Sequence, residues 1–405
     1  MHDTIEAILD SPRFGAARAQ LREDHARFVE EIVALTEIPA PPFKEERRAA
    51  AFAGMLAAEG LEDVGLDAVG NVTGLRRGRG NGSIVAVAAH LDTVFPEGTD
   101  VRVRREGTKL YAPGVGDDTR GLASLLAFVR ALAAADIETD HDILFVADVG
   151  EEGAGDLRGI RHLFTQSVHA PRIRAFYTID GADMESMATG AVGSKRYRVT
   201  FRGPGGHSLM DFGTVNPAHA LAAVVTGLAA LEVPAAPRTT HCASVIGGGT
   251  SINAIPNEVW LEVDLRSEDA GELGRLDAAL HETVSRAVAA ENRRGDTGRG
   301  AVTAEARLIG DRPAGATPAD APIVAAALAA LRAHGFDPKT VASSTDANIP
   351  MSLGIPAIQI GNGPAGGRAH SLEEWIDVEP EATLRSQSAA LAAILAVAGF
   401  RADPA

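Results

Sequence analysis

The sequence predicts an α/β protein with two domains. The larger domain is expected to have a central mixed, mostly parallel sheet flanked by helices, and a smaller α+β domain interrupts it. A chain of 405 residues is longer than one hydrophobic core usually supports. Continuous apolar runs of strand length, such as Ile84–Ala89, are typical of strands buried on both faces. Strands that alternate polar and apolar residues, such as 196–201, are typical of a sheet with one open face.

The expected elements follow from hydrophobic periodicity and from breaks at proline and glycine. In the larger domain we expect helices at 17–38, 44–59, after Asp118, at 322–333 and at 381–397, and strands at 71–75, 84–89, 142–147, 175–179 and 355–360. In the smaller domain we expect a βαββαβ order, with strands at 196–201, 243–246, 259–265 and 302–308 and helices at 217–231 and 270–291. The larger domain is therefore expected in residues 1–192 and 311–405, and the smaller domain in residues 193–310.

Composition and charge exclude several classes of function. The formal net charge of −16 argues against nucleic acid or an anionic membrane surface as a partner. One cysteine, Cys242, rules out a disulfide framework within the chain and fits a reducing compartment. No apolar run reaches membrane-spanning length and no signal-peptide pattern opens the chain. We therefore expect a cytoplasmic protein that binds neither nucleic acid nor membranes.

Side chains suited to metal binding follow the apolar runs. The run 85–89 ends at His90 and Asp92, the run 142–147 leads to Glu151 and Glu152, and the run 175–179 ends at Asp180. The run 355–360 leads on to His370. Ligands of such sheets bind beyond the carboxyl ends of the strands, and His, Asp and Glu are ligands of divalent metals. The sequence therefore predicts a metal site at this edge of the sheet.

Individual residues allow more than one interpretation. Asp117 and Asp118 begin a helix, so they fit a helix cap as well as a metal-bridging carboxylate. Asp92 fits a second metal ligand, or a partner that accepts a hydrogen bond from the other imidazole nitrogen of His90 and orients the ring; we favour the orienting role. Adjacent Glu151 and Glu152 point apart in extended backbone, so one can bind metal while the other serves as general base.

The number of candidate ligands favours two metals. A structural tetrahedral zinc site uses four protein ligands, whereas five with one bridging carboxylate suit two ions that share a water. The sequence has no His-Glu-x-x-His motif and no Gly-x-Ser-x-Gly motif, which argues against a single-zinc helix site and against serine catalysis. The candidate ligands are His90, Asp117, Glu152, Asp180 and His370.

Short motifs in this order resemble those of the di-zinc peptidases and deacylases. That family includes peptidase T, carboxypeptidase G, acetylornithine deacetylase and succinyl-diaminopimelate desuccinylase. The motifs are His90-Leu91-Asp92, Gly116-Asp117-Asp118, Gly150-Glu151-Glu152, Tyr177-Thr178-Ile179-Asp180-Gly181, Gly205-Gly206-His207-Ser208 and Ala369-His370-Ser371. The resemblance spans residues 85 to 371.

The resemblance implies a role for each residue of the metal site. Asp117 would bridge the metals, Glu151 would be the general base and Asp92 would orient His90. The cofactor would be two zinc ions per chain, for which cobalt or manganese can substitute. The inserted domain would be a lid through which two chains form a homodimer.

Three residues of the inserted domain carry further implied roles. Asn253, within Ser251–Pro256, and Arg266 lie where the family contacts substrate, and a guanidinium matches a carboxylate in two-point geometry. A surface ion pair is the alternative for Arg266. His207 matches the lid histidine that reaches the neighbouring subunit's site and stabilises the oxyanion. A lid turn without catalytic contact is the alternative for His207.

The predicted function is hydrolysis of an amide bond in a small peptide or an N-acyl amino acid, with a metal-bridging hydroxide as nucleophile. Peptidase activity, of the peptidase T or carboxypeptidase kind, is favoured over deacylase activity. The alternative outside the enzymes is a protein that binds metal but does not hydrolyse. Such a protein would need Glu152 as a ligand but not Glu151 as a base, so the presence of both glutamates argues against it. Where the family usually has lysine after the paired aspartates, this chain has Thr119-Arg120, which leaves the subfamily open.

Overall fold

The computed structural model describes residues 1–80 and 82–401. The chain divides into two compact units. Unit 1 comprises Met1–Ala191 and Ala316–Ala405, and unit 2 comprises Val192–Gly315. The sequence predicted that the smaller domain ends at residue 310, and in the structure unit 2 ends five residues later. The last four residues of the predicted larger domain, 402–405, lie outside the described part.

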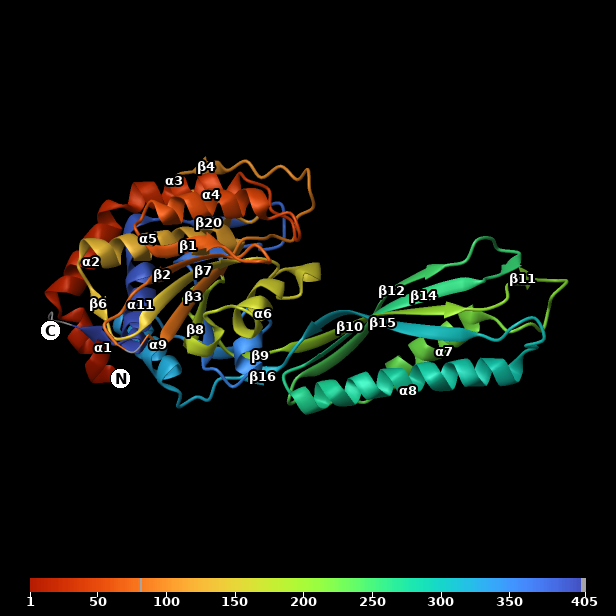
Figure 1. Cartoon of the computed structure of the whole chain (residues 1–405). Helices are drawn as coiled ribbons and strands as arrows, with labels where there is room; N and C mark the ends of the chain where they lie inside the picture. The colour runs from red at the N-terminus through yellow and green to blue at the C-terminus, as the bar shows by residue number, and fades with distance from the viewer. Residues whose placement is uncertain (81, 402–405) are drawn as a thin grey trace. The chain divides into compact units, whose positions relative to one another are not determined.

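A mixed sheet forms the centre of unit 1 (Figure 1). Its inner strands, β7, β3, β8 and β18, are parallel, whereas β1 and β2 at one edge are antiparallel. Strand β18 enters between β8 and β9, although it comes from the chain beyond unit 2. The strands are β1 Glu62–Leu66, β2 Val72–Arg76, β3 Ile84–His90, β7 Asp142–Asp148, β8 Ile173–Ile179, β9 Ser186–Ala191, β16 Gly315–Ala316, β17 Lys339–Ser343 and β18 Ala357–Ile360.

Helices cover both faces of this sheet, as continuous apolar strands require. Alternate residues of β3 point to opposite faces: Val85 and Val87 join one core cluster, and Ala86 and Ala88 join another. The first cluster includes α1 His2–Leu9, α2 Pro12–Glu23, α3 His25–Thr36, α4 Glu46–Ala57, α5 Arg120–Ala134, α9 Pro322–Ala333 and α11 Pro380–Ala398. The second includes α6 Arg158–Thr165 and α10 Asn348–Ser352. These layers confirm the predicted α/β class.

A second, smaller sheet in unit 1 has the order β19-β20-β5-β4. Its strands are β4 Arg104–Glu106, β5 Lys109–Tyr111, β19 Ala365–Gly367 and β20 Trp375–Asp377. The sequence did not predict it, because three-residue strands show too little periodicity. The loop between β19 and β20 contains His370, and the segment after β5 leads to Asp117. This sheet therefore holds together two segments that carry candidate metal ligands.

Unit 2 has the βαββαβ order of an open-faced α+β domain. Within residues 192–315, all of them described, an antiparallel sheet has the order β12-β14-β10-β15. Its elements are β10 Gly193–Arg202, α7 Pro217–Ala229, β12 Thr239–Gly248, β14 Glu258–Ser267, α8 Ala270–Arg294 and β15 Thr303–Arg312. Both helices pack against one face of the sheet, through Val199, Leu261 and Leu276 among others (Figure 1). A separate short ribbon pairs β11 Gly206–His207 with β13 Ala254–Ile255.

The expected helix 17–38 is two helices in the structure. α2 ends at Glu23 and α3 begins at His25, with Asp24 between them. Arg130 explains the placement of Asp24, since its Nε donates to Asp24 Oδ2 at 2.7 Å while its terminal nitrogens bind Glu31. Such a long-range ion pair leaves no trace in local periodicity. In the described part of the chain, no helix combines the length and the apolar character that crossing a membrane requires.

Candidate metal centre

The carboxyl group of Asp117 lies between two imidazoles. Its Oδ1 is 2.9 Å from His90 Nε2, and its Oδ2 is 3.0 Å from His370 Nε2. His90 ends the buried strand β3, Asp117 precedes α5, and His370 comes from the β19–β20 loop. One carboxylate thus faces a different histidine with each oxygen. This is the disposition required of a carboxylate that bridges two cations.

His90 and the two glutamates are positioned through backbone groups. His90 Nδ1 is 3.0 Å from the backbone oxygen of Asp92, whereas the nearer Asp92 carboxylate oxygen is 3.8 Å away. The Asp92 carboxylate instead accepts backbone N–H groups from Glu151 and Glu152, both at 2.9 Å. The sequence led us to expect that the carboxylate of Asp92 orients His90; in the structure its carbonyl does so. The carboxylate fixes the backbone of the glutamate pair.

Glu152 and Asp180 complete the surroundings of the two histidines. Glu152 Oε1 is 2.8 Å from His370 Nε2, and Glu151 beside it is buried. His90, Asp117 and Glu152 place donor atoms within 4.8 Å of one another. His90, Asp118 and Asp180 form a second such group.

The partners of Asp118 are groups that do not ligate metals, whereas those of Asp117 are two imidazoles. Asn362 donates to Oδ1 at 2.8 Å, and the backbone N–H of His90 donates to Oδ2 at 3.2 Å. The peptide bond between Asp117 and Asp118 is cis. The amide of Asn362 and the backbone of His90 thus hold Asp118 in place beside Asp117.

The electrostatics of the centre reflect a concentration of buried acids. Hydrogen bonds to Asp117 and then to Glu152 raise the pKa of His370 to about 11. Burial lowers the pKa of His90, but the hydrogen bond to Asp117 and the charges of Asp117, Asp118 and Asp92 together outweigh burial and raise the net pKa well above its usual value. Burial, and then the charge of Asp117, raises the pKa of Asp180 to about 7. The acids therefore hold protons on both histidines when no metal is present.

These residues fit a divalent metal. Imidazole nitrogens and carboxylate oxygens are the ligands that zinc and related ions use. The raised pKa of Asp180 shows that its negative charge is poorly compensated where it lies. A divalent cation would supply that compensation and replace the protons on the imidazoles.

One carboxylate that supports Asp117 was not predicted from the sequence. Glu374, which is 1% exposed, accepts backbone N–H groups from Gly116 at 2.7 Å, Asp117 at 2.8 Å and Gly114 at 2.9 Å. Glu374 lies four residues after His370, so one loop supplies both a candidate ligand and the group that fixes the opposite loop. The only signal in the sequence was the position of Glu374 shortly after His370. Nothing in the sequence distinguishes Glu374 from its exposed neighbour Glu373.

Arg120 and Asn362 extend this support. Arg120 Nε donates to Asn362 Oδ1 at 2.6 Å, and Asn362 Nδ2 donates to the Gly116 carbonyl and to Asp118 at 2.8 Å each. Both side chains are buried. Thr119-Arg120 stands where the resemblance leads us to expect a lysine. Arg120 contacts Asn362, which in turn binds Asp118, rather than any candidate metal ligand directly.

Two further buried acids, Asp148 and Asp346, lie behind the glutamate pair. Burial raises the pKa of both, and the second effect on Asp346 is the charge of Asp148. Neither carboxyl group has a donor partner among the described residues. The two acids affect each other's pKa, and neighbouring buried carboxyl groups hold one proton between them more favourably than they hold two charges.

In unit 2 the structure brings His207 and Asn253 together but not Arg266. His207 lies on β11 opposite Ala254 of β13. The backbone N–H of Ser208 donates to the Asn253 carbonyl at 3.0 Å. This hydrogen bond ties the segment of His207 to the segment of Asn253.

Arg266 lies apart from this pair, on β14 and on the face of the sheet opposite the helices. Its Nε donates to Asp264 Oδ2 at 2.7 Å, and both side chains are partly exposed. The surface ion pair named as the alternative for Arg266 is therefore present.

The family of the chain can be recognised across the segment that carries this geometry. The model of peptidase family M20/M25/M40 matches residues 86–396, which include every candidate metal ligand. The chain belongs to this family. The resemblance inferred from the short motifs is thereby confirmed, and the protein is a hydrolase of the M20 family.

Several curated relatives in the family are desuccinylases by name. Succinyl-diaminopimelate desuccinylase of Corynebacterium glutamicum is 26% identical over 261 residues, which are 62% of this chain and 69% of that enzyme. The enzyme of the same name from Bordetella bronchiseptica is 29% identical over 255 residues, 57% of this chain and 66% of that enzyme. The chain thus spans about two thirds of the length of these relatives.

Solved structures of M20 peptidases share the fold. Aminopeptidase PepT from Bacillus cereus superposes with a TM-score of 0.74 at 20% identity, covering 92% of this chain and 99% of that one. A dinuclear metal-binding M20 peptidase from Bacillus subtilis superposes with a TM-score of 0.65 at 18% identity, covering 92% and 99%. At these identities the likeness is one of fold.

Substitution of Glu374 tests how the loops of this M20 protein are positioned. Glu374→Ala removes the carboxylate that accepts three backbone N–H groups, so we expect metal affinity to fall about 10- to 100-fold, as is typical when groups behind a ligand are lost. Glu374→Gln keeps one acceptor oxygen and should show a smaller loss. Calorimetric titration of metal into the metal-free protein measures this.

The matched control is Glu381→Gln, which changes an exposed acid paired with Arg22. Melting temperatures of the metal-free proteins separate loss of metal affinity from loss of folding. Metal affinity unchanged in Glu374→Ala would contradict the positioning role.

Proposed function

We propose that this M20 protein is a two-metal, zinc-dependent hydrolase that cleaves an amide bond in a small peptide or an N-acyl amino acid. The observation that carries the proposal is the Asp117 carboxylate, which faces His90 with one oxygen and His370 with the other. Glu152 and Asp180 supply one further carboxylate beside each histidine. The fold likeness to a dinuclear metal-binding peptidase supports the count of two.

The proposed roles divide between metal and protein. Two divalent ions, when bound, would lower the pKa of a shared water and polarise the scissile carbonyl. Glu151 accepts a proton from the attacking water and returns it to the leaving amine. The Asp92 carboxylate holds Glu151 and Glu152 in place through their backbone N–H groups. The base and the ligand are thus fixed by one buried acceptor.

His207 is proposed to stabilise the oxyanion. Its Nδ1 lies 3.2 Å from the backbone nitrogen of Leu209 and 3.4 Å from that of Met210, both positioned to donate to it. A neutral imidazole that accepts at Nδ1 carries its proton on Nε2. His207 therefore presents an N–H donor, which is what an oxyanion requires.

We propose that His207 acts at the site of a second chain in a homodimer formed through unit 2. Large apolar side chains lie exposed around His207, which supports burial against another surface. They are Leu209, Met210, Phe212 and Ile252. Asn253 and Arg266 are proposed to contact substrate, with Arg266 exchanging its pairing with Asp264 for a substrate carboxylate.

Deacylation is the second candidate function, because the curated relatives are named desuccinylases. A panel of dipeptides, tripeptides and N-acyl amino acids, assayed with metal analysis, distinguishes it from peptidase activity. Hydrolysis of none of them, with metal bound, would favour a binding protein. The exposed single cysteine, Cys242, supports our proposal of a cytoplasmic location.

Metal removal tests the proposed centre. We expect chelation to abolish activity, zinc or cobalt to restore it, and metal analysis to give about two ions per chain. Because the pKa of His370 is about 11 without metal, metal must displace a proton, so metal affinity should rise with pH through the neutral range. Calorimetry in buffers of different ionisation enthalpy measures the proton release. A single tight site with no second on titration would contradict the bridging role of Asp117.

Substitution of the paired glutamates separates base from ligand. Glu151→Gln preserves shape but removes the proton acceptor, so kcat should fall by roughly 10²–10⁴ while metal content persists. Glu152→Gln should weaken metal binding, because it replaces the carboxylate that contacts His370. Kinetics and metal analysis of both variants check this. Equal behaviour, or the reverse order, would overturn the assignment.

Mixed dimers test the role of His207 across two chains. Glu151→Gln and His207→Ala chains should each be nearly inactive alone. After mixing, about half the dimers are hybrids with one intact site of two, so about a quarter of wild-type activity should return. Activity is measured after unfolding and refolding the mixed chains, with size-exclusion chromatography to verify dimers. If His207 acts within its own chain, mixing restores nothing.

A further inference from the structure

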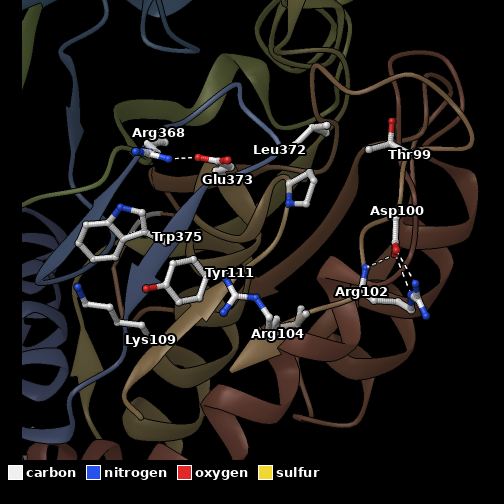
Figure 2. A pocket seen from close by; sticks show the side chains of 12 residues that line it. Thr99, Asp100, Arg102, Arg104, Lys109, Tyr111, Arg368, Leu372, Glu373 and Trp375 are labelled. Atoms are coloured by element: carbon white, nitrogen blue, oxygen red, sulfur yellow. Dashed lines mark hydrogen bonds and ion pairs between the residues drawn. The ribbon is translucent and has the colours of Figure 1, made fainter. Parts of the chain in front are cut away.

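A large groove lies on unit 1 beside the loop that carries His370 (Figure 2). Its volume is about 1170 Å³. Its walls come from the segment before β4, the β4–β5 hairpin and the β19–β20 loop. Its lining residues include none of those assigned to the metal centre. We call it the hairpin groove.

The hairpin groove is basic in an acidic protein. Its cationic lining residues are Arg102, Arg104, Lys109 and Arg368, and its acidic ones are Asp100 and Glu373. The whole chain has a formal net charge of −16. A local excess of positive charge on such a chain favours the binding of small anions at this place over the rest of the surface.

Two of these cations are held on aromatic rings. The Arg104 guanidinium carbon is 4.3 Å from the centroid of the Tyr111 ring, and Lys109 Nζ is 4.3 Å from that of Trp375. Figure 2 shows both pairs along one wall of the groove. Arg104 also contacts the carboxylate of Glu106 in an exposed pair. Stacking restricts the cations without neutralising their charge, so they remain able to bind an anion.

The other two cations indicate which anion fits. Arg102 Nε is 2.9 Å from Asp100 Oδ1, and Arg368 contacts the Glu373 carboxylate. Carboxylates therefore already fit the guanidinium groups of this groove. Both pairs are exposed, and exposed ion pairs contribute little stability, so a carboxylate ligand can replace either acid at little cost.

The groove adjoins the metal centre through Trp375. This residue lines the hairpin groove and also a cavity of about 50 Å³ whose other walls include Asp117 and Asp180. His370 lies in the chain between Arg368 and Leu372, both of which line the groove. A ligand in the groove therefore contacts the loop that supplies a candidate metal ligand.

We propose that the hairpin groove is a binding site for carboxylates, either a carboxylate-bearing extension of the substrate beyond the reacting amide or a free dicarboxylate or tricarboxylate. Arg104 and Lys109 supply the binding charge, with Arg102 and Arg368 at the rim. Only the substrate alternative rests on the proposed hydrolytic function. Binding itself is independent of it.

Tryptophan fluorescence tests binding directly. The chain has two tryptophans, so Trp260→Phe leaves Trp375 as the single reporter. Titration of the metal-loaded full chain with succinate or tricarballylate should give a saturable change in fluorescence. Uncharged succinamide should give none, and inorganic phosphate should bind more weakly. Calorimetry with the unsubstituted protein repeats the measurement without the Trp260 change.

Matched variants locate the site. Arg104→Gln with Lys109→Gln should weaken carboxylate binding about tenfold or more. Arg105→Gln is the control, because Arg105 carries the same charge on the same strand but lies outside the groove lining, with its Nε donating to the Gly107 carbonyl. The proposal would be overturned if no saturable binding were seen, if succinamide bound equally well, or if phosphate bound more tightly. It would also be overturned if the double variant and the Arg105→Gln control weakened binding equally.

Kinetics then distinguish the two sources of the carboxylate. N-succinyl and N-butanoyl derivatives of one amino acid differ in a distal carboxylate. If the ligand is part of the substrate, the double variant should raise KM about tenfold for the succinyl compound alone, with kcat little changed. If it is a free effector, succinate should alter the rate on the butanoyl compound in the wild type but not in the double variant.

The outcomes for the groove and for the proposed hydrolysis are separable. If hydrolysis proceeds and neither kinetic effect is seen, the groove has no part in the reaction and its proposed role is overturned. If the wild-type protein hydrolyses no substrate but binds carboxylates saturably, the result counts against the proposed function and not against the groove.

Discussion

The Asp117 carboxylate, with one imidazole on each oxygen, is the contact on which the centre of unit 1 depends. It requires three segments to meet: the end of β3, the loop before α5 and the β19–β20 loop. Buried polar side chains fix the backbone around this meeting point. Asp92 holds the glutamate pair, Glu374 holds the Asp117 loop, and Arg120 holds Asn362. Negative charge accumulates as a result, and it is this excess that suits the site to divalent cations.

The structure brings together the candidate ligands that the sequence proposed, and for three of them the reason is that they follow apolar strands. Parallel strands bring their carboxyl ends to one edge, so His90, Glu152 and Asp180 converge by topology alone. The longer helices and strands could also be predicted, because their hydrophobic periodicity extends over enough residues to be recognised. The succession of strands and helices in unit 2 followed from its alternating pattern.

What the sequence did not reveal depends on contacts between distant segments. Glu374 and Asn362 act through backbone groups of residues far away in the chain, and nothing local distinguishes them from surface polar residues. The exchange of roles between the carbonyl and the carboxylate of Asp92 depends on backbone geometry that spacing cannot specify. Strands β4, β5, β19 and β20 are too short to produce a periodic signal. Asp24, between α2 and α3, pairs with Arg130, a contact that local periodicity cannot show.

The discontinuity of unit 1 has a consequence for how the centre forms during synthesis. The segment Met1–Ala191 contains His90, Asp117 and Glu152, but β18, Glu374 and His370 emerge only after all of unit 2 has been made. In the complete sheet β18 lies between β8 and β9, and Glu374 binds the backbone of the Asp117 loop, so neither contact can form before unit 2 has been made. Metal that binds the completed centre therefore acts as a cross-link between the first and last parts of the chain. A backbone cut within unit 2 would leave these two parts joined by the pairing of β18 with β8 and by the packing of α9 and α11 against the earlier helices.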